Sequence, residues 1–238
     1  MIREQEVSGD LQDLRGELMA LGGIVETMLL ESVDLLKRCD LDGLERLGDD
    51  ERRIGEIRLA IEMGCMHIIS TQRPKERELR TAVALVEIAS ELERIGEHAK
   101  RVARANSLTL EHHLRRPLVS IHHLATEVQA MLDKALESFV RCDVAAAQSV
   151  LCDAQALDAL YRTVYQELLV VMSSSPRVAT QAIYLSRAAY NLKRAGERVT
   201  GIAEWVSFAV VGTMGDAHPI RREPVPPSEV SGQAAATI

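Results

Sequence analysis

The chain contains an internal repeat with a period of about 100 residues. The segment ELERIGEHAKR at 91–101 is followed, 100 positions later, by NLKRAGERVTG at 191–201. Four residues of the first segment recur unchanged in the second: Leu92 and Leu192, Arg94 and Arg194, Gly96 and Gly196, and Glu97 and Glu197. A repeat of this length indicates that one structural unit occurs twice, which constrains the architecture before any local motif is considered.

The repeat extends towards the N-terminus at a slightly larger offset. Arg38-Cys39-Asp40 recurs 103 positions later as Arg141-Cys142-Asp143. The change in offset falls between 70 and 81, where we expect a loop, because loops absorb changes of length and packed helices do not. We therefore divide the chain into a first unit at 1–106, a second unit at 107–212 and a tail at 213–238.

Apolar residues spaced three and four apart predict six long helices and an all-α fold. The clearest example is the seam from Leu85 to Val102, which recurs from Leu185 to Ile202. Short turns favour antiparallel neighbours, so we expect two tandem three-helix bundles related by a pseudo-two-fold axis. The tail is rich in Pro, Ala, Ser and Gly, and we expect it to be disordered. The predicted helices span about 10–38, 44–70, the segment from Pro74 to 105, the segment from the turn at Pro117 to 141, 144–172, and the segment from Pro176 to 211.

Composition excludes several classes of protein. The formal net charge of −7 argues against a nucleic-acid-binding surface. No long uncharged apolar run is present for membrane insertion, and the charged N-terminus does not resemble a secretory signal. The four cysteines lack C-x-x-C spacing and are typical of a reducing compartment, so we expect a cytoplasmic protein. They are Cys39, Cys65, Cys142 and Cys152.

The candidate site residues are carboxylates on the third predicted helix. Glu93 and Glu97 are four residues apart, so both lie on one face, on the outer side of the seam. They form either a solvated face relieved by neighbouring arginines, or a cation site in which Glu51 supplies a third oxygen. Trp205 and Phe208 are expected in the core, and His98 on the surface.

Nothing in the sequence indicates an enzyme. It contains no G-x-S-x-G, no phosphate-cradling glycine loop and no H-E-x-x-H. The histidine pairs at 112–113 and 122–123 are adjacent in sequence and point apart on a helix, so they are poor metal ligands. We therefore expect no catalytic residues.

The duplicated motif segments at 92–97 (LERIGE) and 192–197 (LKRAGE) resemble the PhoU family of phosphate-transport regulators. That family repeats a segment close to LERIGD, once in each half. Arg94, Gly96, Arg194 and Gly196 match this motif, while Glu97 and Glu197 occupy the position of the motif aspartate in the two copies. The segment LGGIVETML at 21–29 and the turn TQRP at 71–74 are also similar to the family, and the likeness extends over about 11–211.

The resemblance implies a dimeric six-helix regulator of phosphate uptake in the bacterial cytoplasm. Family members restrain the phosphate-specific ABC transporter and keep the phosphate-sensing histidine kinase inactive when phosphate is plentiful. The implied partners are therefore a second copy of the chain, the transporter ATPase subunit and the sensor kinase. The resemblance implies no enzymatic activity.

Some family members carry metal clusters on acidic motifs, and this chain departs from those motifs. Lys193 replaces the acid of the second copy, and Gly55 and Ala154 replace acids of the second and fifth helices. At most one divalent or iron cation is therefore expected, on Glu51, Glu93 and Glu97. Two alternatives remain open: a metal-binding helical-bundle protein, such as a carboxylate di-iron oxidase, and a structural adaptor unrelated to phosphate.

Overall fold

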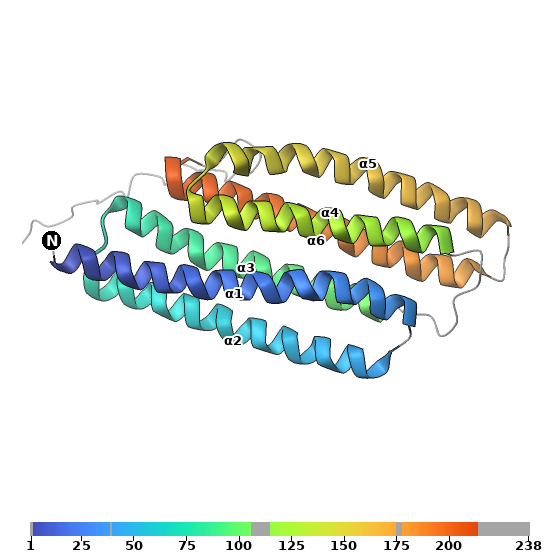
Figure 1. The fold of residues 1–238 in the computed structure, drawn as a ribbon, viewed down its shortest axis with the longest axis horizontal. Coiled ribbons are helices and arrows are strands. Elements are labelled where there is room, and N and C mark those ends of the chain that lie inside the picture. Colours follow the sequence, from blue (N-terminus) through green and yellow to red (C-terminus); the bar gives the residue numbers. More distant parts are fainter. Residues whose placement is uncertain (1, 39, 106–114, 175–177, 214–238) are drawn as a thin grey trace, which may run out of the picture.

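A computed structural model describes residues 2–38, 40–105, 115–174 and 178–213 (Figure 1). These residues form six long helices, and no strand occurs in the described ranges. The helices are α1 (Ile2–Arg38), α2 (Leu41–Gln72), α3 (Glu76–Arg104), α4 (Arg115–Arg141), α5 (Val144–Ser174) and α6 (Ala179–Val211).

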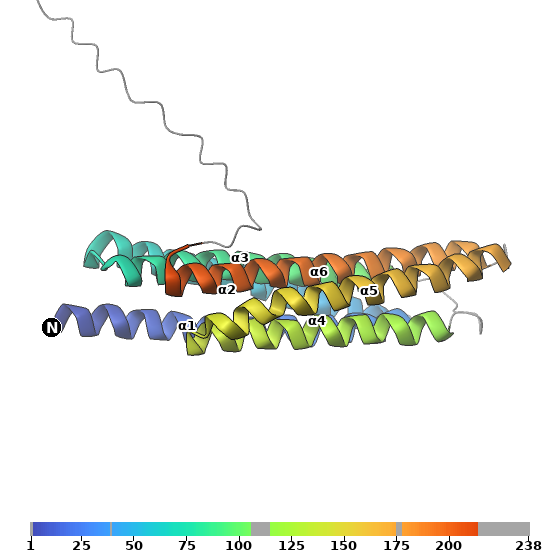
Figure 2. The ribbon, with the colours of Figure 1, turned by 90° about the horizontal axis from the view of Figure 1, so that it is seen from above.

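The helices form two antiparallel three-helix bundles, α1–α3 and α4–α6 (Figure 1). The bundles meet through equivalent helices, α3 against α6 and α1 against α4, as Figure 2 shows from above. Each of these pairs runs antiparallel, which is the arrangement that a two-fold axis across the long dimension produces. The predicted fold class is confirmed.

The predicted seam forms the core of both bundles. Leu85, Ile88 and Leu92 of α3 are fully buried, and Leu185 and Leu192 occupy the equivalent places in α6. About half of the remaining buried positions of α3 and α6 are alanine, which lets two helices approach closely. Trp205 and Phe208 are only half-buried, although Trp205 packs against the core.

The same N-terminal cap begins the second helix of each repeat. The Gly43 N–H donates to Oδ1 of Asp40 at 3.0 Å, and the Ala146 N–H donates to Oδ1 of Asp143 at 3.0 Å. Aspartate is favoured at this position because it satisfies a backbone donor that has no partner within the helix. The repeated Arg-Cys-Asp signature therefore marks a helix start.

The largest difference from the predicted helix boundaries is at the start of α1. We expected the first helix to begin at Asp10, after Ser8 and Gly9, but α1 continues back to Ile2. Val7 and Leu11 are both buried and extend the apolar stripe of α1 across Gly9. Tertiary packing thus outweighs the low helix propensity of glycine.

Some predictions fall outside the described residues. These are the state of Cys39, the histidines at 112–113, the unit boundary at 106–107 and the disorder expected at 214–238. Within the described ranges, no helix is both long enough and apolar enough to cross a membrane. Cys65, Cys142 and Cys152 are free thiols.

Candidate functional site

The two motif segments lie in the middle of α3 and α6, the helices that join the repeats. Leu92 and Leu192 point into the core and are fully buried. Arg94 pairs with Glu91 at 3.3 Å, and Arg194 forms a short ion pair with Glu197. Each motif therefore combines a core leucine with an arginine that is paired with a carboxylate of its own helix.

The motif glycines allow a close helix contact in each bundle. A Cβ added at Gly96 would lie 3.0 Å from Cδ1 of Ile54 in α2. A Cβ added at Gly196 would overlap Cδ2 of Leu157 in α5. Ile54 and Leu157 are equivalent residues of the repeat, so both glycines have the same packing role.

Each predicted metal ligand of the first repeat faces its own basic side chain. Oε2 of Glu93 lies 3.0 Å from Nε of Arg58, and Oε2 of Glu97 lies 2.9 Å from Arg101. Glu51 forms a short ion pair with Lys100 of α3. Carboxylates paired in this way are already neutralised without a metal.

The structure does not place these three carboxylates together as a ligand set. Among the described residues, no group of three or more His, Cys, Asp or Glu side chains is arranged to hold a metal ion. A cation on Glu51, Glu93 and Glu97 stays a prediction, and it would have to compete with the three basic partners.

In the second repeat, Lys193 pairs with two carboxylates, those of Asp158 and Glu197. Nζ of Lys193 lies 3.3 Å from Asp158 and 2.5 Å from Glu197. The hydrogen bond to Glu197 is the main reason that the pKa of Lys193 is raised. Asp158 and Lys193 are the repeat equivalents of Gly55 and Glu93, which also face each other. The same contact is therefore an ion pair in one repeat and a glycine against a carboxylate in the other.

The contact between α3 and α6 contains two polar pairs related by the pseudo-two-fold axis. Oε2 of Glu91 lies 3.6 Å from Arg198, and Nδ1 of His98 lies 3.0 Å from Oδ1 of Asn191. Positions 91 and 191 are equivalent in the repeat, and so are positions 98 and 198. Position 91 of α3 therefore pairs with position 198 of α6, and position 191 of α6 pairs with position 98 of α3. We call this the repeat interface.

The repeat interface overturns the expectation that His98 is a surface residue. His98 is buried at 9% exposure, and Glu91 is 12% exposed. Because Oδ1 of Asn191 can only accept, the imidazole donates its Nδ1–H to it. Apolar periodicity did not identify the residues of the repeat interface, because they lie beside the seam. The opposite charges of Glu91 and Arg198, at positions that face each other in the two repeats, could have indicated the contact.

Burial shifts the pKa of both titratable groups at the repeat interface. Burial, followed by the positive charges of Arg101, Arg198 and Arg194, lowers the pKa of His98, while the bond to Asn191 opposes that shift. Burial also raises the pKa of Glu91, against the opposing charges of Arg198 and Arg94. Both shifts favour the neutral form.

The lowered pKa of His98 predicts a stability that depends on pH. Below the ordinary pKa of 6.5, the unfolded chain binds a proton at His98 that the folded chain excludes. The contribution of neutral His98 to the free energy of unfolding is therefore fully present above pH 6.5. It is lost as the pH falls towards the lower pKa of His98 in the folded protein. We expect His98→Gln to reduce the loss of stability between about pH 7.5 and 5.5, measured by urea unfolding.

The exposed histidine His67 on α2 provides the control for this measurement. His67→Gln should leave the pH dependence of the parent unchanged. Equal pH profiles for the parent and His98→Gln would show that the buried imidazole is not responsible.

Comparisons with known proteins place this fold in a family. The PhoU domain model matches twice, at 18–105 and 121–206. The phosphate-specific transport system accessory protein PhoU homolog of Pseudomonas aeruginosa is 31% identical over 210 residues, covering 88% of this chain and 87% of that protein. The PhoU accessory protein of Escherichia coli K12 is 25% identical over 207 residues, covering 87% of this chain and 86% of its own.

Solved structures agree with these sequence matches. The crystal structure of PhoU from Pseudomonas aeruginosa aligns with a TM-score of 0.79 at 30% identity, covering 87% of this chain and 99% of that one. The phosphate transport system regulatory protein PhoU from Streptococcus pneumoniae shares the fold, with a TM-score of 0.78 at 20% identity, covering 88% and 99% of the two chains. Both matched domains coincide with the two bundles, and each contains one motif segment. This chain belongs to the PhoU family.

Proposed function

We propose that this protein is a cytoplasmic accessory regulator of phosphate uptake that acts by docking on other proteins. In this proposal it restrains the phosphate-specific ABC transporter and links the transporter to the phosphate-sensing histidine kinase. Support comes from the family, whose relatives are named as accessory proteins of the phosphate-specific transport system. A homodimer is part of the proposal.

The observation that carries a docking role is an exposed apolar stripe on α2. Leu59, Met63 and Met66 are spaced four and three apart, so they lie on one helix face, and they are 51%, 55% and 51% exposed. Methionine suits an interaction surface because its unbranched side chain adapts to irregular partners. We call these three residues the α2 apolar stripe.

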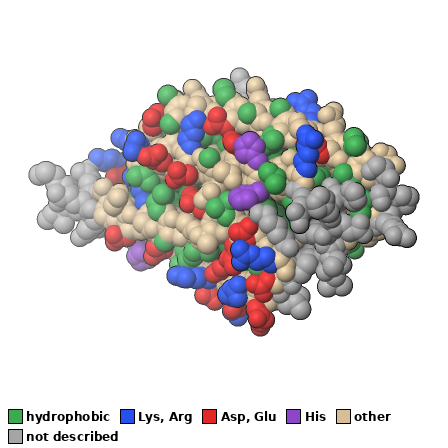
Figure 3. Space-filling view, turned by 45° about the vertical axis from the view of Figure 1, so that its right-hand side comes forward, with side chains coloured by type: hydrophobic (Ala, Val, Ile, Leu, Met, Phe, Trp, Pro, Cys, Tyr) green, Lys and Arg blue, Asp and Glu red, His purple; other side chains and the backbone are tan. Residues whose placement is uncertain are grey.

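The two repeats differ at the α2 apolar stripe. The equivalent positions of α5 are Arg162, Gln166 and Leu169, so the stripe is not repeated at these positions, although α5 also exposes Tyr165 and Val170. A partner that binds the stripe would therefore contact one repeat of each chain. On the face in Figure 3, acidic and basic side chains are interspersed and the hydrophobic side chains occur in small separate groups.

We expect the double variant Met63→Asp, Met66→Asp to lose co-purification with the transporter ATPase subunit. Two carboxylates on the stripe would have to be desolvated against an apolar partner surface. In cells, this variant should leave alkaline phosphatase expressed in phosphate-rich medium, as deletion of the gene should.

Val119→Asp is the matched control, since Val119 is an isolated apolar residue on α4 at 70% exposure. It should co-purify like the parent. Retention of the ATPase by the double variant would exclude the stripe as the docking surface. An unchanged alkaline phosphatase level in the deletion strain would contradict the regulatory function itself, and would favour an adaptor unrelated to phosphate.

A further inference from the structure

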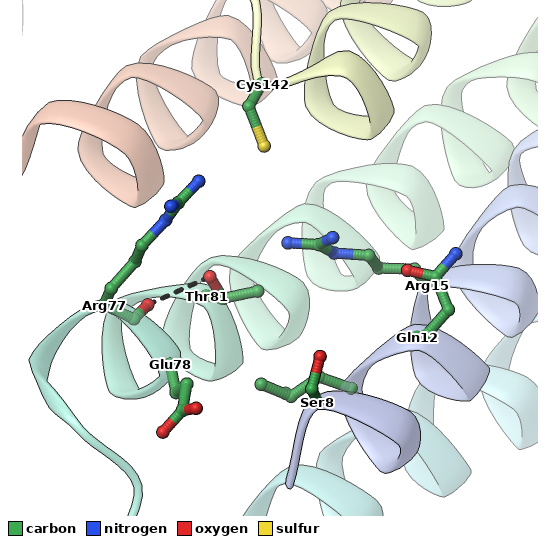
Figure 4. Close-up of a pocket in the computed structure, with 8 residues that line it drawn as sticks. Ser8, Gln12, Arg15, Arg77, Glu78, Thr81 and Cys142 are labelled. Carbon is green, nitrogen blue, oxygen red and sulfur yellow. Dashed lines mark hydrogen bonds between the residues drawn. The ribbon is translucent and has the colours of Figure 1, made fainter. Parts of the chain in front are cut away.

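A polar pocket lies at the junction of the two repeats, away from the motif segments and the α2 apolar stripe. Its volume is about 290 Å³, close to the lower end of the range for small-molecule pockets, roughly 300–1,000 Å³. Figure 4 shows side chains from α1, from the first turns of α3 and from the turn between α4 and α5 converging on it. Its lining residues include Ser8, Gln12, Arg15, Arg77, Thr81 and Cys142.

Two guanidinium groups face this pocket without an acidic partner among the described side chains. Arg15 of α1 lies over the Phe139 ring of the second repeat, 5.5 Å from its centroid, which fixes the direction of the side chain. Its Nε is buried and has no hydrogen-bond acceptor among the residues that the structure describes. Arg77 of α3 extends towards the same space in Figure 4. By contrast, Arg58, Arg94 and Arg101 all pair with carboxylates.

The one carboxylate in the lining is already engaged. Oε2 of Glu78 accepts the Lys75 N–H at 2.8 Å as part of the cap of α3, and in Figure 4 it points away from the two guanidinium groups. The Thr81 hydroxyl donates to the Arg77 carbonyl at 3.0 Å and keeps its capacity to accept. The pocket thus offers unpaired positive charge and neutral hydrogen-bonding groups in a protein of formal net charge −7.

We propose that this pocket binds a phosphate-type oxyanion between Arg15 and Arg77. Guanidinium groups form paired, charge-assisted hydrogen bonds with tetrahedral oxyanions, and two of them match a doubly charged anion. Ser8 and Gln12 supply further donors at the rim. Because Arg15 also contacts the second repeat, occupancy of the pocket would tie α1 and α3 to α4. The binding inference does not rest on the proposed function.

Cys142 gives a direct readout of occupancy. It lies in the α4–α5 turn in a left-handed backbone conformation, at φ 54°, and its sulfur points into the pocket in Figure 4. The thiol is half-buried, so an anion between the arginines would cover it. Two other thiols serve as internal references. Cys152 is exposed, and Cys65 is buried, which raises its pKa to about 11.

The experiment measures alkylation of the purified full-length protein by iodoacetamide, with peptide mass spectrometry to resolve each cysteine. One arm contains inorganic phosphate, a second contains glycerol 3-phosphate, and a third contains chloride at matched ionic strength. We expect phosphate or its monoester to slow alkylation of Cys142 about tenfold while Cys152 reacts as before. Stronger protection by inorganic phosphate would identify the free ion as the ligand, and stronger protection by glycerol 3-phosphate would identify a phosphate monoester. Protection by neither, or equal protection by chloride, would overturn the proposal.

Affinity measured by isothermal titration calorimetry separates the two arginines. Arg77→Gln should bind the anion about tenfold more weakly, because one charge-assisted contact is lost. Arg15→Gln should bind more weakly still, and circular dichroism checks that it folds. Arg53→Gln, a change at an exposed arginine of α2, should bind like the parent. Unchanged affinity in Arg77→Gln would place the anion elsewhere.

Discussion

Leu92→Ala is expected to lower the free energy of unfolding by about 2–5 kcal/mol. Leu92 is fully buried in the seam of α3, and truncation leaves a cavity that tightly packed neighbours only partly fill. Leu192→Ala should cost a similar amount, because Leu192 is equally buried at the equivalent place in α6. Chemical denaturation of the purified variants measures both.

Leu79→Ala on the same helix is the control for this pair, since Leu79 is 40% exposed. Its effect should stay within about 0.5 kcal/mol, as for most surface substitutions. A Leu92→Ala variant that behaves like Leu79→Ala would contradict the packing of α3. A large effect of Leu92→Ala with none of Leu192→Ala would contradict the equivalence of the two repeats.

Gly196→Ala is expected to destabilise the protein by up to about 2 kcal/mol, although alanine has the higher helix propensity. The new methyl group overlaps Leu157, which is buried at 3% exposure and has little room to move. The cost of overpacking, about 1–3 kcal/mol, therefore exceeds the gain in propensity of about 1 kcal/mol. Thermal and urea unfolding measure the difference.

Two further variants test this explanation. Gly16 lies on α1 with nothing within 4 Å of an added Cβ, so Gly16→Ala should stabilise the protein by up to about 1 kcal/mol. In a Leu157→Ala background, Gly196→Ala should become stabilising, because the obstructing side chain is gone. A double-mutant cycle measures this coupling. Independent effects of the two changes would rule out the contact between Gly196 and Leu157.

The repeat interface shows where sequence reasoning stopped. The sequence predicts His98 on the surface, because it is next to Glu97 on the third predicted helix. Its burial depends on α6 of the other repeat, whose position follows from how two bundles associate. Periodicity within one helix identifies the face that packs in its own bundle and contains no information about a second contact face.

The predicted metal ligands of the first repeat show a second limit of sequence reasoning. Spacing placed Glu93 and Glu97 on one outer face, and the structure agrees. Spacing indicated the pair of Arg101 with Glu97, four residues apart on one helix, but not the pairs of Arg58 with Glu93 and Lys100 with Glu51, which join α2 to α3. Ion pairs between helices depend on rotation and register, which sequence separation does not specify.

Six helices, their duplication and the identity of the core leucines follow from the sequence alone, because period and repeat length are properties of the linear chain. The packing of the helices was needed to show that α3 and α6 join the repeats, that the motif glycines admit Ile54 and Leu157, and that Arg15 and Arg77 share a pocket. These features bring together residues far apart in the chain. Their geometry depends on how closely, and at which register, the helices pack.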